Sequence, residues 1–118
     1  MSERTFGPGP ARLLVDGRDV APLTVAHDRA EVRKGLLGTD HLVGALWLTR
    51  CPSVHMVGMR YPIDVAILDR DGRVTATKAL RPGLGLTWPL PGRRDTLEAP
   101  AGALRAWGIT QGSVLRAG

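Results

Sequence analysis

A six-residue apolar segment in the middle of the chain constrains the fold more than any other feature of the sequence. Residues 63–68 read Ile-Asp-Val-Ala-Ile-Leu and are apolar on both faces of an extended chain after Asp64. Such a run is typical of a strand that is buried on both sides. The turn sequence Asp-Arg-Asp-Gly follows at 69–72, and residues 73–77 then alternate between apolar and polar side chains. The pattern predicts a β-hairpin whose first strand is central in a sheet.

Turn-forming residues divide the rest of the 118-residue chain into short segments. The 15 glycines and 9 prolines favour many turns and short strands over long helices. Asp28 is a candidate N-cap for a brief helix at 28–37, and Pro100 precedes a second helix at 101–107. The fold class predicted is mainly β: a small antiparallel β-sandwich or barrel-like domain with one or two short helices. Further short strands are expected at 12–15, 23–26, 45–48, 53–56, 96–99 and 113–116.

The length of the chain fits one domain. We expect a flexible N-terminal arm at residues 1–10, which contains the sequence Gly-Pro-Gly-Pro, and a single globular β domain at 11–118. Six apolar side chains are expected to be buried in its core: Leu36, Leu46, Val65, Ile67, Leu97 and Ile109.

The net charge of +5 comes almost entirely from arginine. The arginines are spread along the chain among Asp and Glu, and aromatic residues are few, so the sequence argues against nucleic-acid binding. No secretion signal is recognisable, and no apolar stretch approaches the ~20 residues that span a bilayer. We therefore expect a cytoplasmic protein with no membrane span. The single Cys51 cannot form an internal disulfide and is interpreted as a small buried hydrophobic residue.

Three blocks of sequence resemble one known family and occur in its order. They are 33–38 (Arg-Lys-Gly-Leu-Leu-Gly), 53–74 (with Ser-Val-His-Met and Pro-Ile-Asp-Val-Ala-Ile-Leu-Asp) and 97–112 (with Leu-Glu-Ala-Pro-Ala-Gly). Through them the chain resembles domain-of-unknown-function family 192 of bacteria and archaea. The resemblance implies a single β-sandwich or barrel-like domain and implies no activity. Many members carry Met-Lys-Asn-Thr where this chain has Met-Val-Gly-Met at 56–59, so two polar side chains suited to a site are missing here.

Asp64 is the candidate site residue under the strongest physical constraint. Strand alternation places it half-buried on the same face as Ala66, and a buried carboxylate needs a cationic or hydrogen-bonding partner. Arg60 is the first choice for that partner, and His55 and Arg33 are others. We favour a structural role for Asp64, in a salt bridge or holding loop amides, over ligand binding or acid/base chemistry.

Residues 81–94 form a long Pro- and Gly-rich segment that carries Trp88. Long ordered loops often carry function, so the leading hypothesis is a non-catalytic binding or accessory domain that docks a partner protein or small ligand through this loop. The resemblance adds pilus or secretion machinery as a class of partner. The alternative is a small enzyme that uses Asp64 with His55 or Glu98 as an acid/base pair. The candidate binding residues are His55, Arg60, Asp64, Trp88 and Glu98.

The sequence contains no signature of a catalytic constellation, a metal site or a cofactor. Its three histidines are far apart with no Cys pair beside them, and neither a Gly-x-Ser-x-Gly turn nor a Gly-rich phosphate loop is present. We therefore lean against an enzyme. A pocket with converging titratable groups is the observation that separates the two hypotheses.

Overall fold

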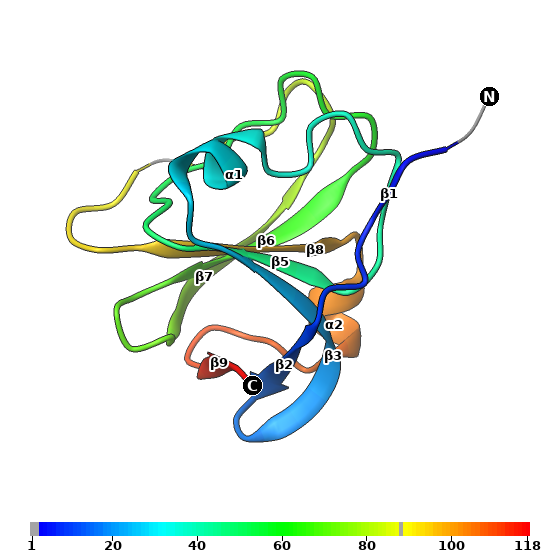
Figure 1. Ribbon diagram of the computed structural model, residues 1–118. Helices are drawn as coiled ribbons and strands as arrows, with labels where there is room; N and C mark the ends of the chain where they lie inside the picture. The colour runs from blue at the N-terminus through cyan, green and yellow to red at the C-terminus, as the bar shows by residue number, and fades with distance from the viewer. Residues whose placement is uncertain (1–2, 88) are drawn as a thin grey trace.

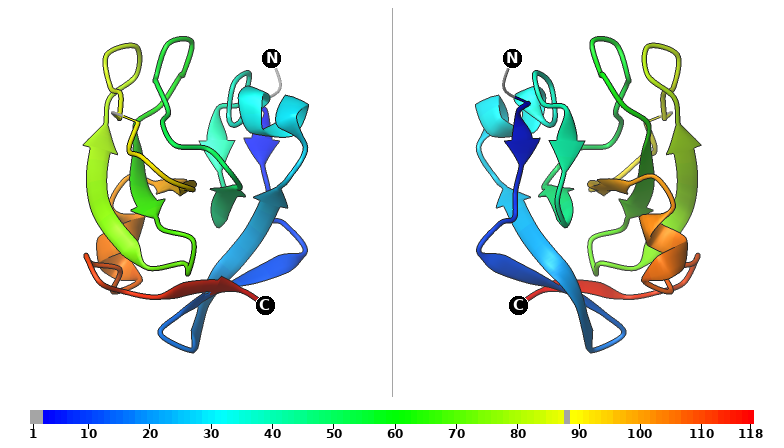
Figure 2. Two further views of the ribbon diagram at one scale, coloured as in Figure 1. Left: turned by 90° about the vertical axis from the view of Figure 1, so that its left-hand side faces the viewer. Right: turned by 90° about the vertical axis from the view of Figure 1, so that its right-hand side faces the viewer.

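A computed structural model describes residues 3–87 and 89–118 of the chain. Its main element is a seven-stranded sheet with the order β7-β6-β8-β5-β3-β2-β9, in which only the β3–β5 pair is parallel. The sheet curls, so that β6 and β7 stand opposite β2 and β3 (Figures 1 and 2). This half-barrel confirms the predicted mainly β, barrel-like fold. The strands are β2 (Ala11–Val15), β3 (Arg18–Ala26), β5 (Ala45–Leu48), β6 (Ile63–Leu68), β7 (Val74–Leu80), β8 (Asp95–Pro100) and β9 (Leu115–Ala117).

The predicted hairpin is confirmed, with β6 as an interior strand between β7 and β8. Its turn is held by Asp69, whose Oδ1 accepts hydrogen bonds from the backbone N–H groups of Asp71 (2.9 Å) and Arg73 (3.0 Å). These donors, above all the N–H of Arg73, lower the pKa of Asp69. The turn sequence and the apolar run together specify this part of the fold.

Both faces of the central strands pack against apolar side chains. Alternation along β8 directs Leu97 and Ala99 into one cluster, which α2 (Ala103–Ala106) covers. Glu98 points to the other face, where its cross-strand neighbours Leu46 and Val65 belong to a second cluster beside α1 (Arg29–Lys34). The expected core is confirmed, because all six of its residues are buried: Leu36, Leu46, Val65, Ile67, Leu97 and Ile109.

Both helices are shorter than predicted. The N-cap of α1 is confirmed, since Asp28 Oδ1 accepts a hydrogen bond from the N–H two residues on (2.7 Å). The helix stops at Gly35 because this residue turns to φ +47° and ψ −126°, outside the helical region. The second helix, α2, begins after Gly102 rather than at Pro100, because β8 continues as far as Pro100.

Residues 53–56 do not form the predicted strand. They pair instead with the loop that contains Leu86, through an isolated bridge between His55 and Leu86. At the N-terminus, β1 (Thr5–Phe6) runs parallel to β4 (His41–Leu42) as a separate two-stranded sheet. The flexibility of residues 1–10 stays a prediction. Within residues 3–87 and 89–118, no helix is long and apolar enough to cross a membrane.

Candidate functional site

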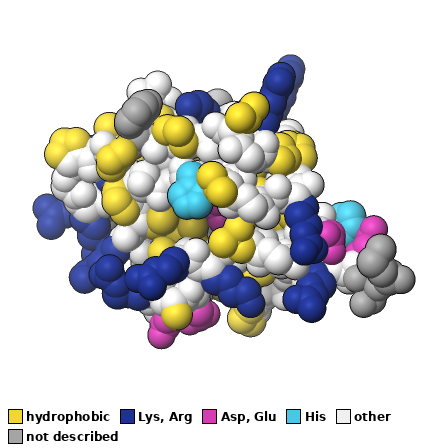
Figure 3. Space-filling view, turned by 90° about the horizontal axis from the view of Figure 1, so that it is seen from above, with side chains coloured by type: hydrophobic (Ala, Val, Ile, Leu, Met, Phe, Trp, Pro, Cys, Tyr) yellow, Lys and Arg dark blue, Asp and Glu magenta, His cyan; other side chains and the backbone are white. Residues whose placement is uncertain are grey.

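One end of the molecule is hollowed between α1, the segment 51–59 and the sheet. Figure 2 shows α1 and two loops gathered at this end, and Figure 3 looks down on it. In that view a histidine lies among hydrophobic side chains, with Lys and Arg side chains around the margin. A cavity of about 200 Å³ lies here; exposed Arg33, Lys34 and His55 line its mouth, and buried residues that include Leu36, Cys51 and Glu98 line its interior.

Glu98 is the unusual residue of this cavity. It is only 6% exposed, and its Oε1 has no hydrogen-bond partner among the residues that the structure describes. Burial in these apolar surroundings raises the pKa of Glu98 to about 7. The carboxyl group is therefore largely neutral below pH 7, and it can both donate and accept a hydrogen bond.

The chain passes close above this carboxyl group at Gly35. A Cβ atom at that position would lie 3.4 Å from Glu98 Oε1, in van der Waals contact with it. The positive φ of Gly35 is also strained for residues with a side chain. Glycine thus ends α1 and leaves room around the carboxyl group.

Cys51 also lines this cavity, where its side chain stays a neutral thiol and does not act as a nucleophile. Its Sγ donates a hydrogen bond to the carbonyl oxygen of Ser53 (3.3 Å). Burial, followed by the nearby charge of Glu98, raises the pKa of Cys51. Because the thiolate is the reactive form, this environment suppresses reactivity and agrees with the interpretation of a buried hydrophobic residue.

His55 lies at the mouth of the cavity and is exposed. Its Nδ1 accepts a hydrogen bond from the N–H of Val57 (3.3 Å), which leaves Nε2 as the donor in the neutral ring. The structure therefore brings two of the candidate residues, His55 and Glu98, to one cavity.

Asp64 lies on the other side of the sheet. Its neighbour Val65 pairs with Glu98, so alternation along β6 directs Asp64 to the opposite face, beside Leu104 of α2. Its Oδ2 accepts a hydrogen bond from the N–H of Gly102 (2.9 Å), which holds the loop that starts α2. The structural interpretation of Asp64 as a carboxylate that holds a loop amide agrees with this contact. An acid/base pair of Asp64 with Glu98 is ruled out by their opposite faces.

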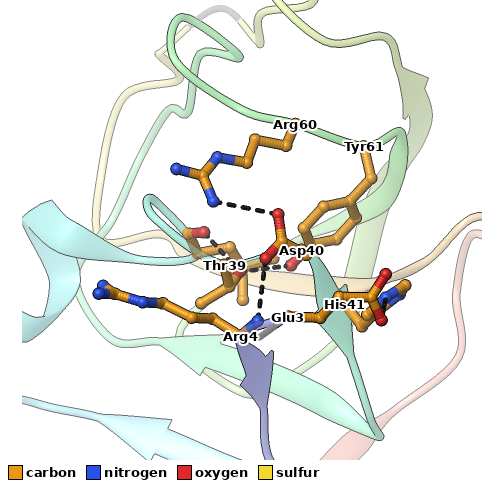
Figure 4. Close-up of polar contacts among 8 residues, drawn as sticks. Glu3, Arg4, Thr39, Asp40, His41, Arg60 and Tyr61 are labelled. Atoms are coloured by element: carbon orange, nitrogen blue, oxygen red, sulfur yellow. Dashed lines mark hydrogen bonds and ion pairs between the residues drawn. The ribbon is translucent and has the colours of Figure 1, made fainter. Parts of the chain in front are cut away.

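Arg60 was expected to pair with Asp64, and this expectation is wrong. Arg60 Nη1 instead donates to Asp40 Oδ1 (3.0 Å), while Asp40 Oδ2 accepts from the N–H of Arg4 (2.9 Å; Figure 4). These two donors, the Arg4 N–H first, lower the pKa of Asp40. A hydrogen bond between Thr39 and Tyr61 (2.8 Å) lies beside them. Asp40 therefore ties three segments of chain together, and Arg60 is bound to it rather than to Asp64.

The loop 81–94 packs against the segment that carries His55. The N–H of Met56 donates to the carbonyl oxygen of Gly85 (2.9 Å), and the N–H of Thr87 donates to that of Val54 (2.9 Å). Trp88 lies outside the described residues. The two segments together carry exposed apolar side chains, which are Val57, Leu84, Leu86 and Leu90.

Sequence reasoning named Glu98 but missed the residues that make it unusual. The sequence predicted a strand at 96–99 that contains Glu98, but alternation alone does not show whether both faces of that strand are buried. Because β8 is an interior strand, both of its faces are buried. No local sequence pattern shows this, because the burial depends on strands from other parts of the chain. Gly35 and Cys51 join the site only through long-range packing.

Comparison with known proteins places the whole domain in one family. The model of family DUF192, described as "Uncharacterized ACR", matches residues 12–117. A search of curated proteins finds no match. A crystal structure of a protein of unknown function from Novosphingobium aromaticivorans DSM 12444 is similar, with a TM-score of 0.74 and 24% identity over 89% of this chain and 83% of the other. A candidate transcription regulator from Sinorhizobium meliloti 1021 gives a TM-score of 0.70 and 20% identity over 91% of both chains. At these identities the two structures show the fold alone.

Proposed function

The chain belongs to domain-of-unknown-function family 192, and we propose that it is a non-catalytic binding domain whose site is the cavity above Glu98. The observation that carries this proposal is the carboxyl group of Glu98, which is 6% exposed and has an oxygen atom without a partner among residues 3–87 and 89–118. Leaving a buried polar group unpaired costs about 1–3 kcal/mol. A ligand with a polar group at the right place would offset that cost.

The size and lining of the cavity indicate what class of ligand would fit. At about 200 Å³ it is smaller than the roughly 300–1,000 Å³ of pockets for drug-sized molecules. Its walls combine apolar side chains such as Leu36 and Val54 with the single carboxyl group of Glu98. This arrangement suits a small, mostly apolar molecule that carries one hydrogen-bonding group.

The enzymatic alternative retains only His55 with Glu98, because Asp64 lies on the opposite face. The sharing of one cavity by His55 and Glu98 is the observation that favours it. Against it stands the state of Cys51, the thiol in the same cavity, which burial keeps protonated. Binding without catalysis is therefore our proposal.

A second part of the proposal concerns the loop 81–94. Leu84 of this loop is 84% exposed, and Val57 of the neighbouring segment is 64% exposed. These side chains border the end of the molecule that carries the cavity, so a partner protein that docks there would contact the loop and cover the site. Pilus or secretion machinery as that partner, and a cytoplasmic location, are predictions from the resemblance and the sequence.

The test is an NMR titration of the ¹⁵N-labelled protein with benzyl alcohol, a small apolar molecule with one hydroxyl group. At pH 6, where Glu98 is mostly protonated, we expect the amide signals of Gly35, Cys51 and Glu98 to shift together. Glu98→Leu should weaken binding about two- to tenfold, the value of one lost hydrogen bond. Glu98→Gln keeps both a donor and an acceptor and should retain most of the affinity.

Asp64→Asn is the matched control, because it changes a carboxylate on the opposite face of the sheet. It should leave the affinity for benzyl alcohol unchanged. Equal affinities of the parent and Glu98→Leu, or signal shifts scattered outside the cavity, would contradict the proposed site.

A further inference from the structure

The cavity above Glu98 adjoins a groove whose charged lining is entirely basic. The groove has a volume of about 320 Å³ and lies along the outer side of α1. Val32 and Arg33 line both the groove and the cavity, so the two spaces lie next to each other along α1. The remaining residues of the groove are His27, Arg29, Thr49 and Arg50.

The cations of this groove are not neutralised by the protein. Across the described ranges 3–87 and 89–118, no carboxylate oxygen lies within 4.0 Å of a side-chain nitrogen of Arg29, Arg33 or Arg50. Other arginines do have such partners, as Arg12 does in Asp19 and Arg60 does in Asp40. Three unpaired guanidinium groups around one acid-free groove attract an anion.

The backbone of Arg50 is held in place by the core. Arg50 adopts φ +50°, a left-handed conformation that is uncommon for residues other than glycine. Its N–H donates to Oδ1 of Asp95 (2.9 Å), and Oδ2 of the same buried carboxylate accepts from Trp47 Nε1 (2.8 Å). The core thus fixes the point from which the side chain of Arg50 extends to the groove.

We propose that the ligand of this domain is a small organic anion with its apolar body in the cavity, a hydrogen-bonding substituent at Glu98, and its carboxylate or phosphate group among Arg29, Arg33 and Arg50. This inference rests on the proposed function and specifies the ligand class. A cationic ligand is disfavoured because it would have to pass Arg33 and Lys34 at the mouth. Arginine suits the role because its planar fork binds carboxylate and phosphate groups through two parallel hydrogen bonds.

The volume of the cavity sets the scale of the apolar body. An engineered apolar cavity of about 150 Å³ in another protein holds benzene. The cavity of about 200 Å³ above Glu98 therefore accepts a ring of this size with one substituent. 4-(Hydroxymethyl)benzoate and 4-(hydroxymethyl)phenyl phosphate are suitable probes, with benzyl alcohol as the neutral analogue and 4-(hydroxymethyl)benzylamine as the cationic one.

The experiment measures the affinity of all four probes by NMR titration at pH 6 and low salt. We expect one of the two anions to bind about tenfold more tightly than benzyl alcohol, the gain of a charge-assisted hydrogen-bonded pair, and the amine to bind most weakly. The preferred anion shows whether the head group is a carboxylate or a phosphate. Added salt should weaken binding of the anion and not of the alcohol.

The double variant Arg33→Gln/Arg50→Gln should lower the affinity for the preferred anion to that for benzyl alcohol. Arg105→Gln, an exposed arginine on α2, is the matched control and should change nothing. If the parent protein binds the anions and benzyl alcohol with equal affinity, this inference is overturned, and the cavity is a site for neutral ligands. Binding of none of the probes would overturn the proposed function as well.

Discussion

Glu98 Oε1 lies 3.4 Å from the position that a Cβ atom on Gly35 would occupy. The two residues are far apart in the sequence, and β8 and the end of α1 bring them together at the cavity. The backbone conformation of Gly35 requires glycine, and an added side chain there would also contact the carboxyl group beneath it.

Gly35→Ala should destabilise the protein by about 1–3 kcal/mol, because alanine at φ +47° and ψ −126° is strained. Urea denaturation of the variant and the parent measures this change. Gly38→Ala is the control, since Gly38 also has a positive φ but has no atom within 4 Å of its added Cβ. A cost at Gly35 no larger than that at Gly38 would contradict the strain assigned to the backbone of Gly35.

The raised pKa of Glu98 predicts that stability depends on pH. Because the folded-state pKa is about 7 and the unfolded value is 4.5, the folded protein holds this proton more tightly. The stabilising effect is fully present below pH 4.5 and is lost as the pH rises through 7, a difference of about 3 kcal/mol. Glu98→Gln removes the titration, so its free energy of unfolding should rise relative to the parent between pH 5 and pH 8. Urea titrations across this range measure the effect, and parallel curves for the two proteins would contradict it.

Asp64→Ala tests the structural role of Asp64. The variant loses the hydrogen bond from the Gly102 N–H, so its free energy of unfolding should fall by about 0.5–1.5 kcal/mol. Asp64→Asn keeps a carbonyl oxygen that can accept this bond and should lose less. Hydrogen exchange at the Gly102 amide provides the local measurement, and unchanged exchange in Asp64→Ala would count against the assigned contact.

Asp40 joins the N-terminal segment to the rest of the protein. Asp40→Ala removes the acceptor of the Arg4 N–H and should accelerate exchange of this amide. Arg60→Ala leaves that bond in place and should have a smaller effect. The lowered pKa of Asp40 means that its stabilising effect is present above pH 3.8 and is lost as the pH falls through the lower folded-state value. If both variants exchange at the rate of the parent, Asp40 does not hold the segment.

Local patterns predicted much of the fold, because the hairpin of β6 and β7 depends on neighbouring residues. The parallel pairing of β3 with β5 joins segments separated by a helix and a turn, and no local signal specifies it. The partner of Arg60 was chosen by proximity in sequence to Asp64, whereas the true partner, Asp40, comes from a distant segment. Glu98 was placed in the right strand, but its burial depends on the whole sheet.

The central claim is that Glu98 is a buried, largely neutral carboxyl group open to a ligand. The most direct test follows the ¹³C chemical shift of its side-chain carboxyl carbon by NMR as the pH is raised, with and without benzyl alcohol. The account predicts a midpoint near pH 7 in the free protein, and a higher midpoint with benzyl alcohol bound, because the apolar ring further desolvates the charged form. A midpoint near the ordinary value of 4.5 that benzyl alcohol does not move would contradict it.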